Sequence, residues 1–274
     1  MRKKTLIIFI FLILQSICVY SQENYPQRII SLSPTITEEL YLLGVENKLI
    51  GCTIYCETPP EAREKEKVGT VKGFNLEKVV ALQPDLVLTT TLVKQKSKDK
   101  LKNVGIEVIT FPTATNFNDI CRQFLKLGII VGKEEKAKNI IKKAKDKTNA
   151  IRGNVRNLPK PKVFAQIGAK PLFAATKDYS INDFIEFAGG INITRDLKNG
   201  LYSREEVLRN NPDVIFIVTM GIVGDQEKTV WEKYKVITAV KDKRIYVLDS
   251  NKLCSPTPVS FVDTLEEVVE ILHQ

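Results

Sequence analysis

Histidine is nearly absent from this sequence: the only one among its 274 residues is His273, next to the carboxyl terminus. Catalysis by a histidine base and zinc binding through imidazole both need this side chain, so the sequence gives neither of them a basis. Two nucleotide-binding signatures are also missing, because no Gly-x-Gly-x-x-Gly follows a strand and no phosphate-binding loop occurs. We therefore expect that the protein is not an enzyme.

Long apolar runs are missing beyond residue 21, so no later segment is predicted to cross a membrane. The beginning of the chain differs, because basic residues 2–4 precede an apolar stretch at 5–14 that is too short to span a bilayer. We expect residues 1–21 to be a signal peptide and the protein to be exported to the periplasm. The alternative is a lipoprotein anchored at Cys18, although Ile17 stands where such sites favour a small residue.

The composition is that of a globular protein, with 43% hydrophobic and 27% charged residues, and the length suffices for one large domain or two modest ones. The formal net charge is +9, and lysines gather at 94–102 and 133–147. Solvated helix faces are the simplest explanation of these lysines. No segment combines aromatic and basic residues in a nucleic-acid-binding motif, so we expect no nucleic acid partner.

Four cysteines follow the predicted signal peptide: Cys52, Cys56, Cys121 and Cys254. In an oxidising compartment they can pair in three ways, and the sequence does not choose among them. Cys121 falls on the apolar side of a predicted helix, which favours an inert position in the core.

One pattern occurs twice. Glu77 stands seven residues before Pro84-Asp85 and an apolar strand, and Glu205 stands seven residues before Pro212-Asp213 and a similar strand. Because proline lacks an N–H and disfavours helical geometry in the preceding residue, each copy predicts a short helix that stops at the proline. The repeat therefore predicts two similar lobes, each with one glutamate at an equivalent position.

Strands and helices alternate with short connections in both halves of the chain, which is typical of an α/β fold with mainly parallel sheets. Between the halves, apolar residues recur at helical spacing and predict one long helix from about residue 134 to 152. We predict an amino-terminal lobe at 22–132, a linker helix within 133–158 and a carboxyl-terminal lobe at 159–274. A further helix is predicted at 230–240.

Four segments together resemble those of a known family: Arg28–Glu38, Asn75–Asp85, Phe187–Asn192 and Tyr202–Val207. Their order and spacing are similar to those of the periplasmic vitamin B12 and ferric-siderophore binding proteins, the substrate-binding components of ABC importers. The resemblance covers almost the whole chain after residue 21. It implies two α/β lobes joined by one rigid helix, with a ligand cleft between the lobes.

The resemblance also implies a role for the repeated glutamates. Glu77 and Glu205 would lie on the outer tips of the lobes and dock onto arginines of an ABC permease in the inner membrane. The alternative is that each glutamate only stabilises the start of its helix. The implied function is capture of a metal-containing small molecule (ferric siderophore, haem or corrinoid) and its delivery to the permease, by a protein expected to be a monomer.

The expected ligand contacts come from both lobes. The resemblance places Tyr55 and Phe173 at aromatic cleft positions, where both rings can stack on a flat ligand, and core packing is the alternative for Phe173. Lys72 is a cationic candidate for an anionic ligand. The predicted contact set is Thr35, Tyr55, Cys56, Lys72, Phe173, Tyr202 and Cys254.

Sulfur ligands for a metal are a further prediction. Cys52 and Cys56 flank Tyr55, and Cys254 lies in a segment expected to face the same cleft, so thiolates of these three residues can coordinate iron or cobalt. The alternatives are a disulfide or ordinary packing. No intrinsic cofactor is expected. The alternative function is that of a cysteine-using metal carrier, or of a cell-surface lipoprotein without a role in transport.

Overall fold

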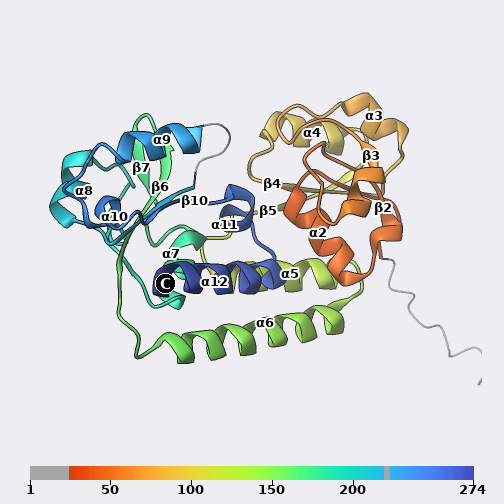
Figure 1. Ribbon diagram of the computed structural model, residues 1–274. Coiled ribbons are helices and arrows are strands. Elements are labelled where there is room, and N and C mark those ends of the chain that lie inside the picture. The colour runs from red at the N-terminus through yellow and green to blue at the C-terminus, as the bar shows by residue number, and fades with distance from the viewer. Residues whose placement is uncertain (1–24, 219–222) are drawn as a thin grey trace, which may run out of the picture.

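The computed structural model describes residues 25–218 and 223–274, which form two lobes above a layer of long helices (Figure 1). The amino-terminal lobe lies on the right of the figure and the carboxyl-terminal lobe on the left. The predicted signal peptide at 1–21, with Cys18, lies outside the described residues. Within the described part of the chain, no helix combines the length and apolar character needed to cross a membrane.

The amino-terminal lobe contains a five-stranded parallel sheet in the order β3-β2-β1-β4-β5. Alternate strand residues enter two different cores: Ile29 and Leu88 pack on one face, and Ile30 and Val87 on the other. The inner strands β1 and β4 are buried along almost their whole length because both faces of the sheet are covered there. The elements are β1 (Ile29–Ser31), α2 (Pro34–Leu43), β2 (Leu49–Cys52), β3 (Glu66–Lys67), α3 (Leu76–Ala81), β4 (Leu86–Thr90), α4 (Gln95–Asn103) and β5 (Glu107–Phe111), with 3-10 turns at Glu46–Lys48 and Pro60–Glu64.

The carboxyl-terminal lobe has a second five-stranded sheet in the order β10-β9-β6-β7, with β8 also paired to β6. Only the β6–β7 pair is antiparallel, so the predicted α/β fold with mainly parallel sheets is confirmed. The elements are β6 (Lys162–Ala169), β7 (Leu172–Ala174), α7 (Ser180–Phe187), β8 (Ile191–Asn192), α8 (Arg204–Asn210), β9 (Val214–Ile217), α9 (Val223–Trp231), α10 (Thr238–Lys241), β10 (Ile245–Val247) and α11 (Ser250–Cys254).

The repeated sequence has the same structural role in both lobes. Each copy is a short helix (α3 or α8), a residue with positive φ, a Pro-Asp pair and a central strand. The Asp85 carboxylate accepts a hydrogen bond from the Arg28 backbone N–H at the start of β1, over 3.0 Å, and the Asp213 carboxylate accepts one from the Lys162 N–H at the start of β6, over 2.7 Å. Each aspartate therefore ties the beginnings of two neighbouring parallel strands.

Three helices form the layer beneath the lobes: α5 (Phe117–Ile130), α6 (Glu134–Val155) and α12 (Pro258–His273). The predicted long helix begins at residue 134 as expected and extends to 155. It does not join the lobes alone, because Phe117 and Ile120 of α5 pack in a carboxyl-terminal core while Phe124 and Leu127 of the same helix pack in an amino-terminal core. The boundaries of the three predicted segments stay predictions.

The helix predicted at 230–240 is wrong, because α9 ends at Trp231 and a turn separates it from α10. Trp231 and Ile237 are both fully buried in the same core. Residues six apart lie about 120° apart around a continuous helix, so a turn in the chain helps to bury both in one core. The Asn211 side chain stabilises the start of α10, since its amide oxygen accepts a hydrogen bond from the Thr238 N–H over 2.8 Å.

Candidate ligand cleft and docking residues

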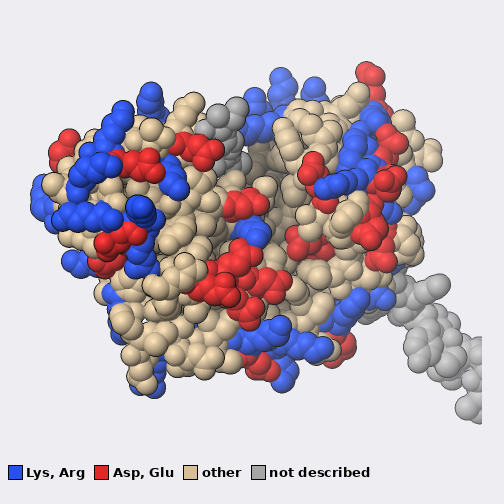
Figure 2. Space-filling model, in the orientation of Figure 1, with Lys and Arg blue, Asp and Glu red and all other residues tan. Residues whose placement is uncertain are grey.

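The segments that follow the carboxyl ends of β1 and β10 meet between the two lobes. In the amino-terminal lobe, α2 follows β1, and the Thr35 hydroxyl at its start donates to the Ser255 carbonyl over 2.9 Å. Ser255 follows β10 and α11, so it comes from the same edge of the other sheet. Ligands of open α/β sheets bind at this edge. Figure 2 shows the surface hollowed between the lobes, above the helical layer.

Exposed apolar side chains line the amino-terminal side of this cleft. Ile54 and Tyr55 follow β2 with 46% and 58% of their surfaces exposed, and Leu92 follows β4 with 61% exposed. Parallel strands end at one edge of their sheet, so these three residues share the edge that carries Thr35. The sequence prediction included Tyr55 but missed Ile54 and Leu92, each of which lies two residues after the last residue of its strand.

The predicted aromatic contacts of the carboxyl-terminal lobe are part of its packing. Phe173 is half-buried against Gly200, where an added Cβ would lie 2.5 Å from the phenyl ring. The Tyr202 ring stacks on Phe164 with 6.0 Å between the ring centroids, and its hydroxyl accepts from the Asn210 amide over 2.6 Å. The structure therefore gives both rings packing partners, and their contact with a ligand stays a prediction.

Two other predicted contact residues are accessible. Lys72 is exposed in the turn after β3, at the same edge of the sheet as Tyr55. Cys254 is exposed at the end of α11, next to the Ser255 that meets Thr35. These positions provide one cationic group at the carboxyl edge of the amino-terminal sheet and one thiol next to the contact between the lobes.

The predicted metal-binding cysteines are not gathered at one place. Cys52 and Cys56 are buried together in the amino-terminal lobe, whereas Cys254 is exposed in the other lobe. Across residues 25–218 and 223–274, no three His, Cys, Asp or Glu side chains lie close enough to hold a metal ion together. Coordination by any one of the three thiols stays a prediction.

The buried pair has unequal thiols. The neighbouring Cys52 thiol, with hydrogen bonds between the Cys56 sulfur and the Thr37 and Thr53 hydroxyls, lowers the pKa of Cys56 to about 6. The neighbouring Cys56 sulfur and burial raise the pKa of Cys52, although the Lys67 ammonium lies 3.3 Å from its sulfur. The pair therefore favours a single negative charge on the Cys56 sulfur, while Cys52 keeps its proton.

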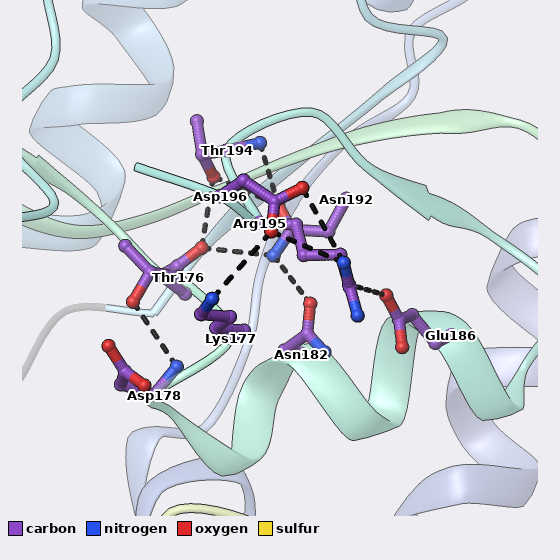
Figure 3. A network of polar contacts seen from close by, with 10 residues as sticks. Thr176, Lys177, Asp178, Asn182, Glu186, Asn192, Thr194, Arg195 and Asp196 are labelled. Carbon is purple, nitrogen blue, oxygen red and sulfur yellow. Dashed lines mark hydrogen bonds and ion pairs between the residues drawn. The ribbon is translucent and has the colours of Figure 1, made fainter. Parts of the chain in front are cut away.

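A polar network stabilises the loops of the carboxyl-terminal lobe (Figure 3). The buried Asn192 amide donates to the Asn182 side chain and to the Ala175 carbonyl, both over 3.0 Å, and so joins β8 to α7. At its rim, the Lys177 ammonium lies 3.9 Å from the Asp196 carboxylate. Asn192, the last residue of the segment 187–192 that resembles the family, therefore holds these loops together.

The two repeated glutamates are both exposed and lie on different lobes. Glu77 is in the first turn of α3 and Glu205 in the first turn of α8, on opposite sides of the molecule in Figure 1. The neighbouring Glu206 is engaged, since its carboxylate accepts from the Ser203 N–H over 2.9 Å in a capping box. Glu205 is therefore the carboxylate that this helix start presents to solvent.

Two α/β lobes that face each other across a cleft, above a common helical layer, define a two-lobed substrate-binding protein. A model of the family described as periplasmic binding protein matches residues 29–252. The chain belongs to this family, and it is an extracytoplasmic substrate-binding component of ABC transport.

Curated relatives and solved structures agree with this assignment. The chain is 29% identical over 258 residues to an uncharacterized ABC transporter substrate-binding lipoprotein, YvrC, of Bacillus subtilis, covering 90% of this chain and 80% of that one. It is 27% identical to a vitamin B12-binding protein of Vibrio parahaemolyticus, covering 94% and 96%. A possible iron-binding (periplasmic solute-binding) protein of Staphylococcus epidermidis superposes with a TM-score of 0.83 at 25% identity, covering 92% and 100%.

Proposed function

We propose that this protein captures a metal-containing small molecule between its lobes and delivers it to the permease of an ABC importer. The observation that carries the proposal is the cleft itself, where Ile54, Tyr55 and Leu92 expose an apolar surface at the carboxyl edge of a parallel sheet. Such a surface suits a flat or bulky ligand that is largely apolar. The similarity to a vitamin B12-binding and a possible iron-binding protein supports a corrinoid, a haem or a ferric siderophore.

The proposed role is binding and transfer, without catalysis. The protein would act in the periplasm after removal of residues 1–21, as a monomer that docks on the permease through Glu77 and Glu205. The exposure of both glutamates on separate lobes supports docking, because two distant charge pairs fix the orientation of a complex. Lipid anchoring at Cys18 is the alternative for its location, supported by the relative that is a lipoprotein.

The ligand class is tested by thermal unfolding of the purified protein with haemin, cyanocobalamin and ferric hydroxamate or catecholate siderophores. A ligand that binds only the folded protein stabilises it by about 2.7 kcal/mol at a hundredfold excess over its Kd. We expect one metal-containing compound to raise the melting temperature as its concentration increases, and its metal-free counterpart to have a smaller effect. If none of the compounds shifts the transition, the proposed ligand class is wrong.

A further inference from the structure

Two free cysteines flank the loop that follows β2 and carries Ile54 and Tyr55, the cleft loop. Cys52 is the last residue of β2 and Cys56 closes the following turn, with its N–H bonded to the Thr53 carbonyl over 3.1 Å. The Cys52 thiol donates to the Ala62 carbonyl over 3.7 Å, the Lys67 ammonium contacts both residues, and both cysteines are fully buried. Between them, Ile54 and Tyr55 are exposed in the cleft.

The surroundings of the pair are polar and positively charged. The Lys67 ammonium lies 3.3 Å from the Cys52 sulfur and donates to the carbonyls of Cys56 and Ala62 over 3.1 and 2.8 Å. The Thr37 hydroxyl donates to the Cys56 sulfur over 3.2 Å. A half-buried ammonium whose acceptors are two carbonyls and a sulfur favours a thiolate, which is the reactive form of cysteine. An inert core cysteine has no need of such partners.

We propose that Cys52 and Cys56 are a redox-active pair that closes to a disulfide, and that this bond fixes the cleft loop carrying Ile54 and Tyr55. The protein acts outside the cytoplasm, where disulfides form and persist. The disulfide would close residues 52–56 into a covalent loop that contains both exposed apolar residues. The redox state of the pair would therefore set how far the segment that carries Tyr55 can move.

The oxidant is a small-molecule disulfide. The Cys56 sulfur, having lost its proton, attacks one sulfur of the oxidant, breaks the oxidant's S–S bond and releases one thiol. The Cys52 sulfur then gives up its proton, attacks Cys56 and displaces the second thiol. Two protein thiols are oxidised and one external disulfide is reduced to two thiols. Glu57 and Thr58 beside the pair are exposed, so a local movement of this loop suffices to admit the oxidant.

Mass spectrometry after oxidation tests the bond directly. The double variant Cys121→Ser/Cys254→Ser leaves only this pair among the described thiols. After treatment with oxidised glutathione, denaturation and alkylation, we expect a protein that has lost the mass of two hydrogen atoms and takes up no alkylating agent. Dithiothreitol should restore two alkylated thiols. A protein that keeps both thiols free, or carries only glutathione adducts, overturns the proposal.

Peptide mapping of the oxidised wild-type protein gives the same answer if the double variant does not fold, because a 52–56 linkage leaves Cys121 and Cys254 separate. The effect on the loop is measured by hydrogen exchange of the amides at 53–57. We expect exchange there to be at least about threefold slower in the oxidised form. The single variant Cys56→Ser should show no change on treatment. Equal exchange in both forms of the wild type would refute the control of the loop.

Discussion

Tyr55 lies in the loop after β2 with 58% of its surface exposed. Its ring is not part of a buried core, so it is available to a ligand. The only tryptophan, Trp231, is fully buried, so Tyr55 is the exposed aromatic residue of this loop. A single aromatic anchor in a pocket commonly contributes much of the binding energy.

We expect Tyr55→Ala to weaken ligand binding by about 2 kcal/mol, roughly thirtyfold in Kd, as measured by calorimetry. Tyr55→Phe should keep most of the affinity because it keeps the ring. Val104→Ala is the matched control, since Val104 is 53% exposed but precedes β5 and so lies at the opposite edge of the sheet. An unchanged Kd in Tyr55→Ala would remove this residue from the site.

Glu39 on α2 is a buried acid, with only 5% of its surface exposed. Burial, helped by the neighbouring Glu38 carboxylate, raises the pKa of Glu39 to about 8. The folded protein therefore holds this proton at pH values where the unfolded chain has lost it. Because the folded state binds more protons between about pH 4.5 and 8, the free energy of unfolding should fall as pH rises through this range.

Glu39→Gln removes the titration, so we expect a flatter pH profile and a gain of roughly 2 kcal/mol or more in the free energy of unfolding at pH 8. Denaturant unfolding between pH 5 and 8 measures both effects. The exposed Glu107→Gln variant should retain the wild-type slope. A Glu39→Gln variant with the same slope as wild type would show that Glu39 does not hold this proton.

At the scale of the elements, the close contact between α5 and α6 stabilises the helical layer. Gly128 of α5 faces Ala137 of α6 so closely that an added Cβ would lie 2.5 Å from the Ala137 Cβ. Gly153 of α6 has open space around the same position. The two glycines therefore separate the effect of packing from that of helix propensity.

Gly128→Ala should lower the free energy of unfolding by about 1 to 3 kcal/mol, because the helices must move apart. Gly153→Ala should raise it by about 0.5 to 1 kcal/mol, because alanine favours the helix and meets nothing there. Thermal or denaturant unfolding gives both values. Opposite signs for the two variants support the packing argument, and a stabilised Gly128→Ala would contradict it.

Several elements are predictable from the sequence because a local signal determines them. The Pro-Asp repeats end α3 and α8, and helical spacing over more than five turns predicts α6. The double role of α5 was not predictable, because periodicity shows that a helix has an apolar face but not which lobe covers each half. The same limit applies to Phe173: its place against Gly200 depends on the short antiparallel β7, which carries no clear sequence signal.

The site was predictable only in part, for a related physical reason. Tyr55, Cys254 and Thr35 lie at the edge between the lobes. In the sequence, Ile54 and Leu92 look like ordinary core residues, because only the observed ends of β2 and β4 show that both are exposed. Cys52 and Cys56 are close in sequence, yet their burial under the loop and their contact with Lys67 depend on residues from β3.

At the scale of the molecule, the helical layer limits how far the lobes can move. Direct contacts between the lobes, such as the bond of the Thr257 hydroxyl to the Glu38 carboxylate over 3.3 Å, add to the link through α5, α6 and α12. Three packed helices resist a wide hinge motion, so only small closure is expected. A nearly constant separation of Glu77 and Glu205 follows, which suits docking on a permease with two fixed contact points.

Docking is tested by Glu77→Lys together with Glu205→Lys. We expect ligand affinity to stay within about twofold of wild type, because neither residue is among the predicted ligand contacts, and ligand uptake through the permease to be lost. The matched control is Glu107→Lys with Glu232→Lys, which makes the same charge change at exposed positions elsewhere on the lobes. Uptake at the wild-type rate would exclude docking, and lost ligand affinity would show that the glutamates act on the cleft.

The most direct test of the account is hydrogen exchange with and without a ligand found in the unfolding screen. A ligand held between the lobes should slow exchange at 53–56 and 91–94 in one lobe and at 252–255 in the other, while α3 and α8 exchange as before. Protection confined to one lobe, or to surfaces outside the cleft, would contradict the claim that the ligand is bound between the facing edges of the two sheets.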